Sequence, residues 1–332
     1  MILVRRISLF SALTCSGLVL LTGTFSLAAY AAQDLGRRPD VETIRPETTT
    51  GMQTFFEALD YEWSALEQGV PPLILQNIPH DIAKTSNLEA KKQSFFMGLL
   101  PMVLLANQEI RQERAQVLEI LQKHRAGQLQ DDDRARLNAI MQRYELRGRP
   151  LVDHRTRSTL LRRVDTIPPS LVLAQAANES AWGTSRFARL GNNLFGEWTF
   201  KPGSGIVPED RPSGAIYEVR KFPSLYESIR SYMKNLNTHS AYRKLRQIRE
   251  RLRQSGQAVT GIALAHGLSK YSQRGAAYVT EIQAMIRQNS LAKANQASLR
   301  LPGETAYIPV STAGAGLFSS RSRMIGHTPS LR

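Results

Sequence analysis

Cysteine is almost absent from this chain: one residue, Cys15, is the only cysteine among 332 residues. A single cysteine forms neither a disulfide within the chain nor a cysteine zinc site. The six histidines are scattered, and none shows the paired spacing of metal ligands. The sequence also lacks a glycine-rich phosphate loop ahead of a helix and a Gly-x-Ser-x-Gly segment. These absences argue against metal, nucleotide and serine-hydrolase chemistry, and we expect no cofactor.

Acidic residues are also scarce relative to basic ones. The chain has 28 Asp and Glu against 43 Lys and Arg, a formal net charge of +15, which predicts attraction to polyanions. No run of more than three consecutive basic residues occurs, and no aromatic–basic segment of an RNA-binding sheet is present, so we do not expect nucleic acid as a partner. A hydrophobic content of 42% and a charged content of 21% indicate a globular protein of one or two domains.

Residues 1–31 predict a secretory signal peptide. Two arginines precede an apolar stretch from about Leu9 to Leu27, and Ala29-Tyr30-Ala31 fits the small-x-small rule for cleavage. The alternative is an uncleaved membrane anchor, because the apolar stretch is longer than the usual ~7–15 residues. We therefore predict export to the bacterial periplasm or cell envelope, with no membrane attachment after cleavage. The lack of disulfides is compatible with that location.

The rest of the chain predicts a mainly α-helical fold (α+β) with one small β-hairpin lobe. A strongly amphipathic helix is predicted to start at Asn87. Pro101 lies inside this helix, where it favours a kink. Glycines and prolines frame two short strands, Gly205–Val207 and Ala215–Phe222, which make the lobe. The predicted segments are a linker (32–52), a helical N-terminal region (53–148), a second folded segment (149–290) and a disordered tail (291–332).

The most informative stretch is AQAANESAWGTS at residues 174–185. It places Glu179 at the end of an otherwise apolar helix, where partial burial raises the pKa of a carboxyl group toward working pH. A carboxyl that keeps its proton is what a general acid needs for cleavage of a glycosidic bond. Gly183 is expected to end the helix, and Trp182 to line the acid or stack on a sugar ring. The alternative is a solvated helix end.

A second stretch, GNNLFGEW, follows at residues 191–198. Asn192 and Asn193 carry amide donors and acceptors suited to acetamido and hydroxyl groups, and Phe195 offers an apolar face. Asparagine-rich turns usually only cap loops, so this stretch gains its meaning from its position shortly after Glu179.

Together, ESAWGTS and GNNLFG resemble the glucosaminidase family of peptidoglycan hydrolases, glycoside hydrolase family 73, which has a lysozyme-like fold. The closer resemblance is to the Bax proteins within that family, over roughly residues 88–289. It rests on KKQSFFMGLLPMVLLAN, EVRKF, SIRSYMKNLNTH, AYRKLR and SKYSQRGAAYV as well. The resemblance implies cleavage of the β-1,4 bond after N-acetylglucosamine in peptidoglycan or a related glycan. It also implies that residues 149–290 are the catalytic domain and that Glu179 is the catalytic acid.

The resemblance leaves the second catalytic group open. Family members often have a glutamate in the lobe, and we predict Glu218 because it lies in the Bax-like segment; Glu209, which fits better by distance from Glu179, is assigned to substrate binding. An N-acetyl group of the substrate acting as the nucleophile would make either one unnecessary. Tyr271 and Tyr278 resemble the late tyrosines of the family, and a phenol there orients an acetamido group or water.

The sequence therefore predicts a wall-cleaving glycosidase with Glu179, Glu218 and Tyr278 as catalytic residues. The predicted substrate-binding residues are Trp182, Asn192, Asn193, Phe195, Tyr271 and Glu209. A lytic transglycosylase is one alternative, although the Gly-Leu-Met-Gln segment usual after its glutamate is absent. A non-catalytic cell-wall-binding protein is the other. The oligomeric state is left open.

Overall fold

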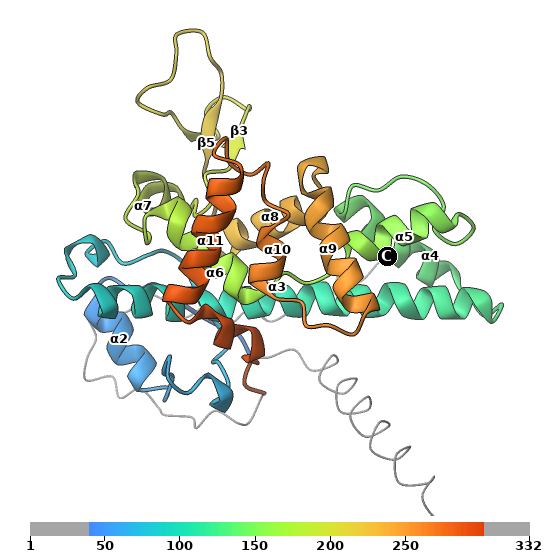
Figure 1. Ribbon diagram of the computed structural model, residues 1–332, viewed down its shortest axis with the longest axis horizontal. Coiled ribbons are helices and arrows are strands. Elements are labelled where there is room, and N and C mark those ends of the chain that lie inside the picture. The colour runs from blue at the N-terminus through green and yellow to red at the C-terminus, as the bar shows by residue number, and fades with distance from the viewer. Residues whose placement is uncertain (1–39, 302–332) are drawn as a thin grey trace, which may run out of the picture. The chain divides into compact units, whose positions relative to one another are not determined.

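The computed structural model describes residues 40–301. The predicted signal peptide, the start of the predicted linker and the tail beyond residue 301 lie outside the described residues. The described part is mainly helical with two small sheets, which confirms the expected fold class (Figure 1). No helix within residues 40–301 is long and apolar enough to cross a membrane.

The described chain has ten α-helices and five short strands, and three of the strands were not predicted from the sequence. The α-helices are α2 (Thr49–Glu57), α3 (Leu88–Arg125), α4 (Asp131–Arg143), α5 (His154–Arg163), α6 (Pro169–Ser180), α7 (Arg186–Gly191), α8 (Leu225–Thr238), α9 (Arg243–Gln254), α10 (Gly261–Ala265) and α11 (Ala276–Gln288). The strands are β1 (Glu42–Ile44), β2 (Leu73–Leu75), β3 (Trp198–Thr199), β4 (Gly205–Ile206) and β5 (Glu218–Arg220), and the 3₁₀ helix η4 spans Leu291–Gln296.

The long helix α3 is the backbone of the N-terminal region. The side chain of Asn87 accepts a hydrogen bond from the backbone N–H of Ala90 and so caps its start. Basic residues fill its last turn, where the helix dipole favours positive charge. The helix runs through Pro101 without interruption. Its N-terminal half packs against α6 and α8, and its C-terminal half against α4.

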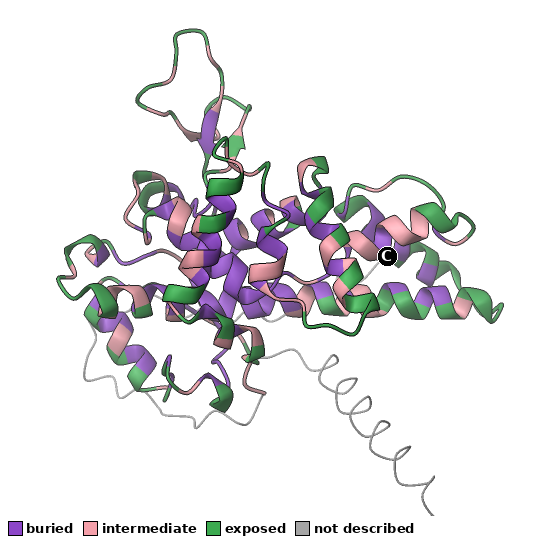
Figure 2. Ribbon diagram, viewed as in Figure 1, coloured by how far each residue is buried: buried purple, intermediate pink, exposed green. Residues whose placement is uncertain are grey.

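Helix α6 lies at the centre of the main hydrophobic core. All residues from Pro169 to Ala177 are buried, so the helix is covered on every side (Figure 2). Helices α3, α10 and α11 and the 3₁₀ helix η4 contact it. One continuous core runs from Ile44 to Ala294 and joins the predicted N-terminal region to the segment that follows residue 149. A smaller second core joins α3, α4 and α5 through Val117, Ile120, Leu121, Leu137, Ile140, Met141, Tyr144, Leu160 and Val164.

The β-lobe is an antiparallel sheet in the order β3-β5-β4, and it projects from the helices (Figure 1). The two predicted strands are present but shorter, and the sequence prediction missed β3. Because β3 is present, β5 is the central strand: its middle residue Val219 pairs with Trp198 of β3 and with Ile206 of β4.

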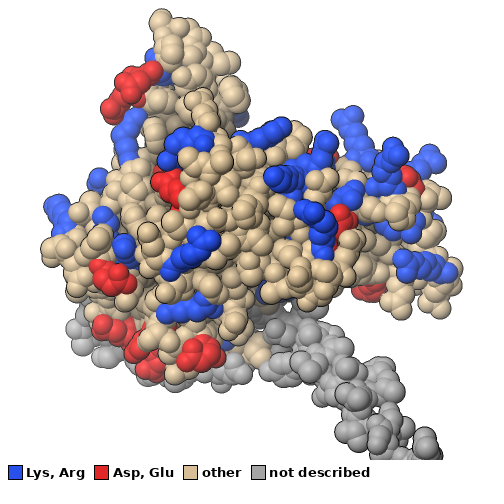
Figure 3. All heavy atoms as spheres, viewed as in Figure 1, with Lys and Arg blue, Asp and Glu red and all other residues tan. Residues whose placement is uncertain are grey.

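The first sheet was also missed in the sequence. Residues 42–44, within the stretch interpreted as a linker, form β1, which pairs in parallel with β2, and α2 begins at Thr49. Each strand has only three residues, too few for an alternating pattern to be recognised. Lysines and arginines are spread over the face shown in Figure 3 and outnumber the acidic side chains there, in keeping with the positive net charge.

Candidate active site

Glu179 is the penultimate residue of α6 and is partly buried. The helix ends at Ser180, three residues before the glycine expected to end it. Ala181, Trp182 and Gly183 then adopt left-handed backbone angles, with φ of 49°, 59° and 78°. A non-glycine residue pays about 1–2 kcal/mol for this conformation. The turn is held because the backbone N–H of Gly183 donates to Ser180 Oγ at 2.8 Å.

One carboxylate oxygen of Glu179 is engaged and the other is free. The hydroxyl of Tyr278 donates to Oε1 at 2.6 Å, and Asn178 Nδ2 lies 3.3 Å from the same oxygen. No hydrogen-bond donor among residues 40–301 reaches Oε2. The two oxygens of Glu179 therefore have different environments, and Oε2 is the one left for an incoming group.

Tyr278 is itself hydrogen-bonded to a series of buried side chains. Gln175 Nε2 donates to the Tyr278 hydroxyl at 2.8 Å, and the Tyr232 hydroxyl donates to Gln175 Oε1. Gln175 and Tyr232 are almost fully buried, and Tyr278 is 1% exposed. Sequence reasoning singled out neither Gln175 nor Tyr232. The sequence did contain one indication for Gln175: it lies one helical turn before Glu179, which puts both residues on one face of α6.

Stacked tyrosines form a wall beside Glu179. The rings of Tyr271 and Tyr278 are parallel within 6° with centroids 5.3 Å apart, and Tyr242 lies 5.9 Å from Tyr271. Burial and the charge of Glu179 raise the pKa of Tyr278 far above its ordinary value, and burial raises the pKa of Tyr271 as well. These phenols therefore stay protonated around neutral pH and act as hydrogen-bond donors.

The GNNLFG segment builds the base of the β-lobe. Asn193 is 1% exposed; its amide donates to the carbonyls of Glu197 and Arg220, and its Oδ1 accepts the backbone N–H of Phe195 and Glu197. Asn192 has φ of 52° at the end of α7 and donates to the carbonyl of Phe222. In this structure both asparagine amides are thus bonded to backbone and hold the lobe to the helices.

Phe195 connects that segment to the tyrosines. Its ring stacks on Tyr232 with centroids 3.8 Å apart, and its carbonyl accepts the hydroxyl of Tyr271 at 3.3 Å. The residue is 5% exposed, so it packs within the core and offers little surface to a ligand.

Trp182 connects the site to the N-terminal region. Its ring centroid lies 5.1 Å from that of Phe96 and 6.0 Å from that of Phe95, both on α3. Lys92 Nζ lies 5.4 Å from the ring centroid. Trp182 remains partly exposed. The residue that follows the acid by three positions is therefore packed against a helix distant in the sequence.

The two predicted lobe carboxylates have partners of their own. Glu218 is 5% exposed, and its oxygens accept the backbone N–H groups of Gly203 and Gly205 at 2.8 and 2.7 Å. These hydrogen bonds lower the pKa of Glu218. Glu209 is exposed and pairs with Arg186 at 3.2 Å. Neither is hydrogen-bonded to Glu179 in the part of the chain that the structure describes.

A third carboxylate, Glu197, was missed in the sequence. Its Oε2 accepts the hydroxyl of Ser231 at 2.7 Å, while Oε1 is buried and has no hydrogen-bond partner among the described residues. Burial raises the pKa of Glu197. Burial, together with the charges of Glu179 and Glu197, raises the pKa of Tyr242 to about 12. Glu179 and Glu197 therefore both contribute to the raised pKa of Tyr242. The available signal was an acidic residue directly after GNNLFG.

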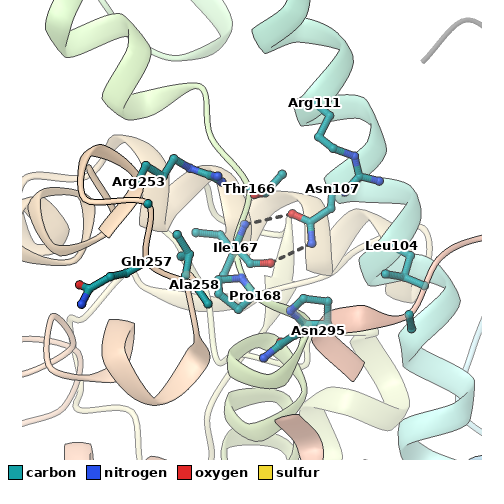
Figure 4. Close-up of a pocket in the computed structure, with 14 residues that line it drawn as sticks. Leu104, Asn107, Arg111, Thr166, Ile167, Pro168, Arg253, Gln257, Ala258 and Asn295 are labelled. Carbon is teal, nitrogen blue, oxygen red and sulfur yellow. Dashed lines mark hydrogen bonds between the residues drawn. The ribbon is translucent and has the colours of Figure 1, made fainter. Parts of the chain in front are cut away.

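One cavity of the described chain lies away from this chemistry. It has a volume of about 470 Å³ and is lined by Pro168 and Pro169, at the opposite end of α6 from Glu179 (Figure 4). Asn107 projects there but is bonded to the backbone of Ile167 in both directions, at 2.8 and 3.0 Å. No cluster of three or more potential metal ligands occurs within residues 40–301.

Comparison with known proteins agrees with the motifs. A family model described as glucosaminidase, mannosyl-glycoprotein endo-beta-N-acetylglucosaminidase, matches residues 158–291. Protein bax of Escherichia coli (strain K12) is 36% identical over 209 residues, which cover 63% of this chain and 73% of that protein. The chain belongs to the Bax family. It carries a glucosaminidase domain, and this confirms the family resemblance inferred from ESAWGTS and GNNLFG.

The match to a solved structure is remote. The catalytic domain of the autolysin Auto from Listeria monocytogenes is 19% identical, with a TM-score of 0.30; the match covers 55% of this chain and 86% of that one. The glucosaminidase match includes α6, the β-lobe and α11, and hence Glu179 and Tyr278. The Bax similarity extends over more residues than that match contains, so it reaches beyond the glucosaminidase domain.

Proposed function

We propose that this Bax-family protein hydrolyses β-1,4 N-acetylglucosaminyl bonds in peptidoglycan or a related glycan, with Glu179 as the general acid. The observation that carries the proposal is the unequal environment of the two Glu179 oxygens. Tyr278 holds Oε1, whereas Oε2 has no partner among the described residues. The glucosaminidase match supports the class of substrate.

In this proposal the proton of Glu179 resides on Oε2 and passes to the oxygen of the leaving sugar. As the proton leaves, negative charge develops on the carboxylate, and the Tyr278 hydroxyl at 2.6 Å from Oε1 stabilises it by a charge-assisted hydrogen bond. The phenol keeps its own proton and remains a donor, because burial and the charge of Glu179 raise its pKa far above neutrality. Tyr271 stacks on Tyr278 and keeps the ring in place.

The second catalytic group stays a prediction. For Glu218, the hydrogen bonds to Gly203 and Gly205 support a role in shaping the β-lobe, since both of its oxygens are occupied. Glu209 is exposed and available to a substrate. We favour the acetamido group of the substrate as the nucleophile, because it needs no second free carboxylate at the site.

Peptidoglycan lies outside the cytoplasm, so the proposed activity requires export of the protein. This agrees with the predicted signal peptide, which is outside the described residues. Sequencing the N-terminus of the secreted protein tests the predicted cleavage after residue 31.

The variant Glu179→Gln tests the proposal because it keeps the shape of the side chain and removes the acid. We expect release of dye-labelled fragments from purified peptidoglycan to fall by about 10²–10⁴-fold, the usual contribution of a general acid. Circular dichroism and the unfolding midpoint serve as the control for folding. A folded variant with full activity contradicts the assignment.

Product analysis separates the alternatives. Mass spectrometry of wild-type digests should show new reducing N-acetylglucosamine ends. Anhydro-muramic ends would identify a lytic transglycosylase instead. Binding to intact wall without released fragments would identify a non-catalytic wall-binding protein.

A further inference from the structure

Gln175 is a buried polar residue one turn before the proposed acid on α6. It is 0% exposed, and each side of its amide has a single partner, Tyr232 on α8 and Tyr278 on α11. A buried amide in the core is costly unless both sides are hydrogen-bonded. Here both are, so the orientation of the amide is defined by its surroundings.

The amide imposes a direction on the hydrogen bonds around it. Its oxygen only accepts and its nitrogen only donates. Tyr232 donates to the oxygen, so the nitrogen faces Tyr278 and donates to the phenol oxygen. Because Tyr278 accepts from Gln175, its own proton points to Glu179 Oε1.

Reversing the Gln175 amide would change the hydrogen bond between Tyr278 and Glu179. If the amide were reversed, Tyr278 would donate its proton to Gln175 and accept from Glu179, and the carboxyl proton would be directed at the phenol, away from the leaving sugar. Reversal would turn the amide nitrogen toward the buried hydroxyl of Tyr232 and remove the oxygen that accepts its proton. Phe195 of the GNNLFG segment stacks on the ring of Tyr232, with centroids 3.8 Å apart. The GNNLFG segment is thereby connected to the Gln175 amide through the ring of Tyr232.

We infer that Gln175 is a positioning residue that keeps Tyr278 as a donor to Glu179 Oε1 and so leaves the acidic proton on Oε2. This inference rests on the proposed function. It assigns to the buried chain of Tyr232, Gln175 and Tyr278 the task of choosing which carboxylate oxygen delivers the proton. None of these three contacts requires substrate, so the choice is made before binding.

The variant Gln175→Met tests the inference, because methionine has a similar length and no hydrogen bonds. On defined muropeptides we expect kcat to fall by about 10–100-fold, as for other groups that orient a catalytic residue, while KM stays within about 2-fold. A merely structural role would lower the unfolding midpoint and leave kcat per folded molecule unchanged.

Gln283→Met is the matched control. Gln283 is also a buried glutamine with two contacts, to the carbonyl of Ile262 and to His266, and it lies on α11 outside the chain of three. We expect it to lose comparable stability and to keep kcat. Equal kcat in the two variants overturns the inference.

If Gln175→Met fails to fold, the variant Tyr232→Phe tests the inference instead. It removes the hydroxyl that orients the amide and retains the ring on Phe195. We expect kcat to fall about 5-fold, which corresponds to one hydrogen bond, with KM unchanged. Unchanged kcat in this variant, or a change confined to KM, overturns the inference. A wild-type protein without activity overturns the proposed function as well, whereas an active wild type with an unaffected Gln175→Met overturns the inference alone.

Discussion

At the scale of single residues, Glu197 stands apart because one of its oxygens is buried without a partner. Ser231 donates to the other oxygen at 2.7 Å, and Arg220 lies 4.0 Å from it. Desolvation outweighs these two favourable contacts and raises the pKa of Glu197. The charged form is therefore disfavoured in the folded state relative to the unfolded chain.

This makes a prediction about pH. A carboxyl with a raised pKa in the folded state costs stability as pH rises from its ordinary value through the raised one, and costs nothing below both. We expect Glu197→Gln to be more stable than the wild type at pH 7, with the difference shrinking toward pH 4. Urea unfolding of both proteins across this range provides the measurement. A difference that does not vary with pH would show that Glu197 is not the group responsible.

The end of an apolar helix predicted Glu179, the family resemblance predicted Tyr278, and the structure joins these two by a hydrogen bond. Neither the helix pattern nor the resemblance predicted where the neighbouring side chains point. The sequence predicts Asn193 as a substrate-binding residue, and in the structure its amide is buried and donates to the carbonyls of Glu197 and Arg220. One of these carbonyls directly precedes β3 and the other belongs to β5, and the sequence order does not place β5 beside Asn193.

At the scale of elements, helix α9 is anchored by buried arginines. Arg249 is 1% exposed; it donates to the carbonyls of Arg162, Asp165 and Thr166 and pairs with the Asp165 carboxylate at 3.4 Å. Burial lowers the pKa of Arg249 to about 10, so it is still charged at neutral pH. The contacts fasten the connection between α5 and α6, which sets the start of the helix that carries Glu179.

We expect Arg249→Met to destabilise the protein by about 3–5 kcal/mol, because it removes one partner of a buried ion pair and leaves several carbonyls without a donor. Arg251→Met is the control on the same helix. Arg251 is exposed, and a change there should stay within about 0.5 kcal/mol. Chemical denaturation of the two variants measures the difference. Equal stabilities would mean that the buried arginine does not anchor α9.

At the scale of the whole described chain, the predicted N-terminal region and the segment after residue 149 share one hydrophobic core. Phe95, Phe96 and Leu100 on α3 are at most 2% exposed, and α3 covers α6 and contacts Trp182. Removing this helix would expose a large apolar surface of α6 to water. The region before residue 149 therefore acts as part of the support of the site.

A fragment of residues 149–301 tests this dependence. We expect it to be insoluble or to lack a cooperative unfolding transition, whereas co-expression with residues 40–148 restores both solubility and activity. Calorimetry of the full chain should show one transition for residues 40–301, since one core holds them together. A fragment that unfolds cooperatively on its own and cleaves peptidoglycan would show that the two segments are separate folding units.

By itself, the sequence determined the helix order, the position of Glu179 at the end of an apolar helix and the family to which the chain belongs. These features depend on local patterns, since apolar spacing, capping residues and short motifs act over a few neighbouring residues. Only the tertiary structure decided that Tyr278 faces one oxygen of Glu179, that Gln175 directs this bond and that α3 supports Trp182. Those contacts join residues far apart in the chain, and their geometry follows from packing that no local pattern records.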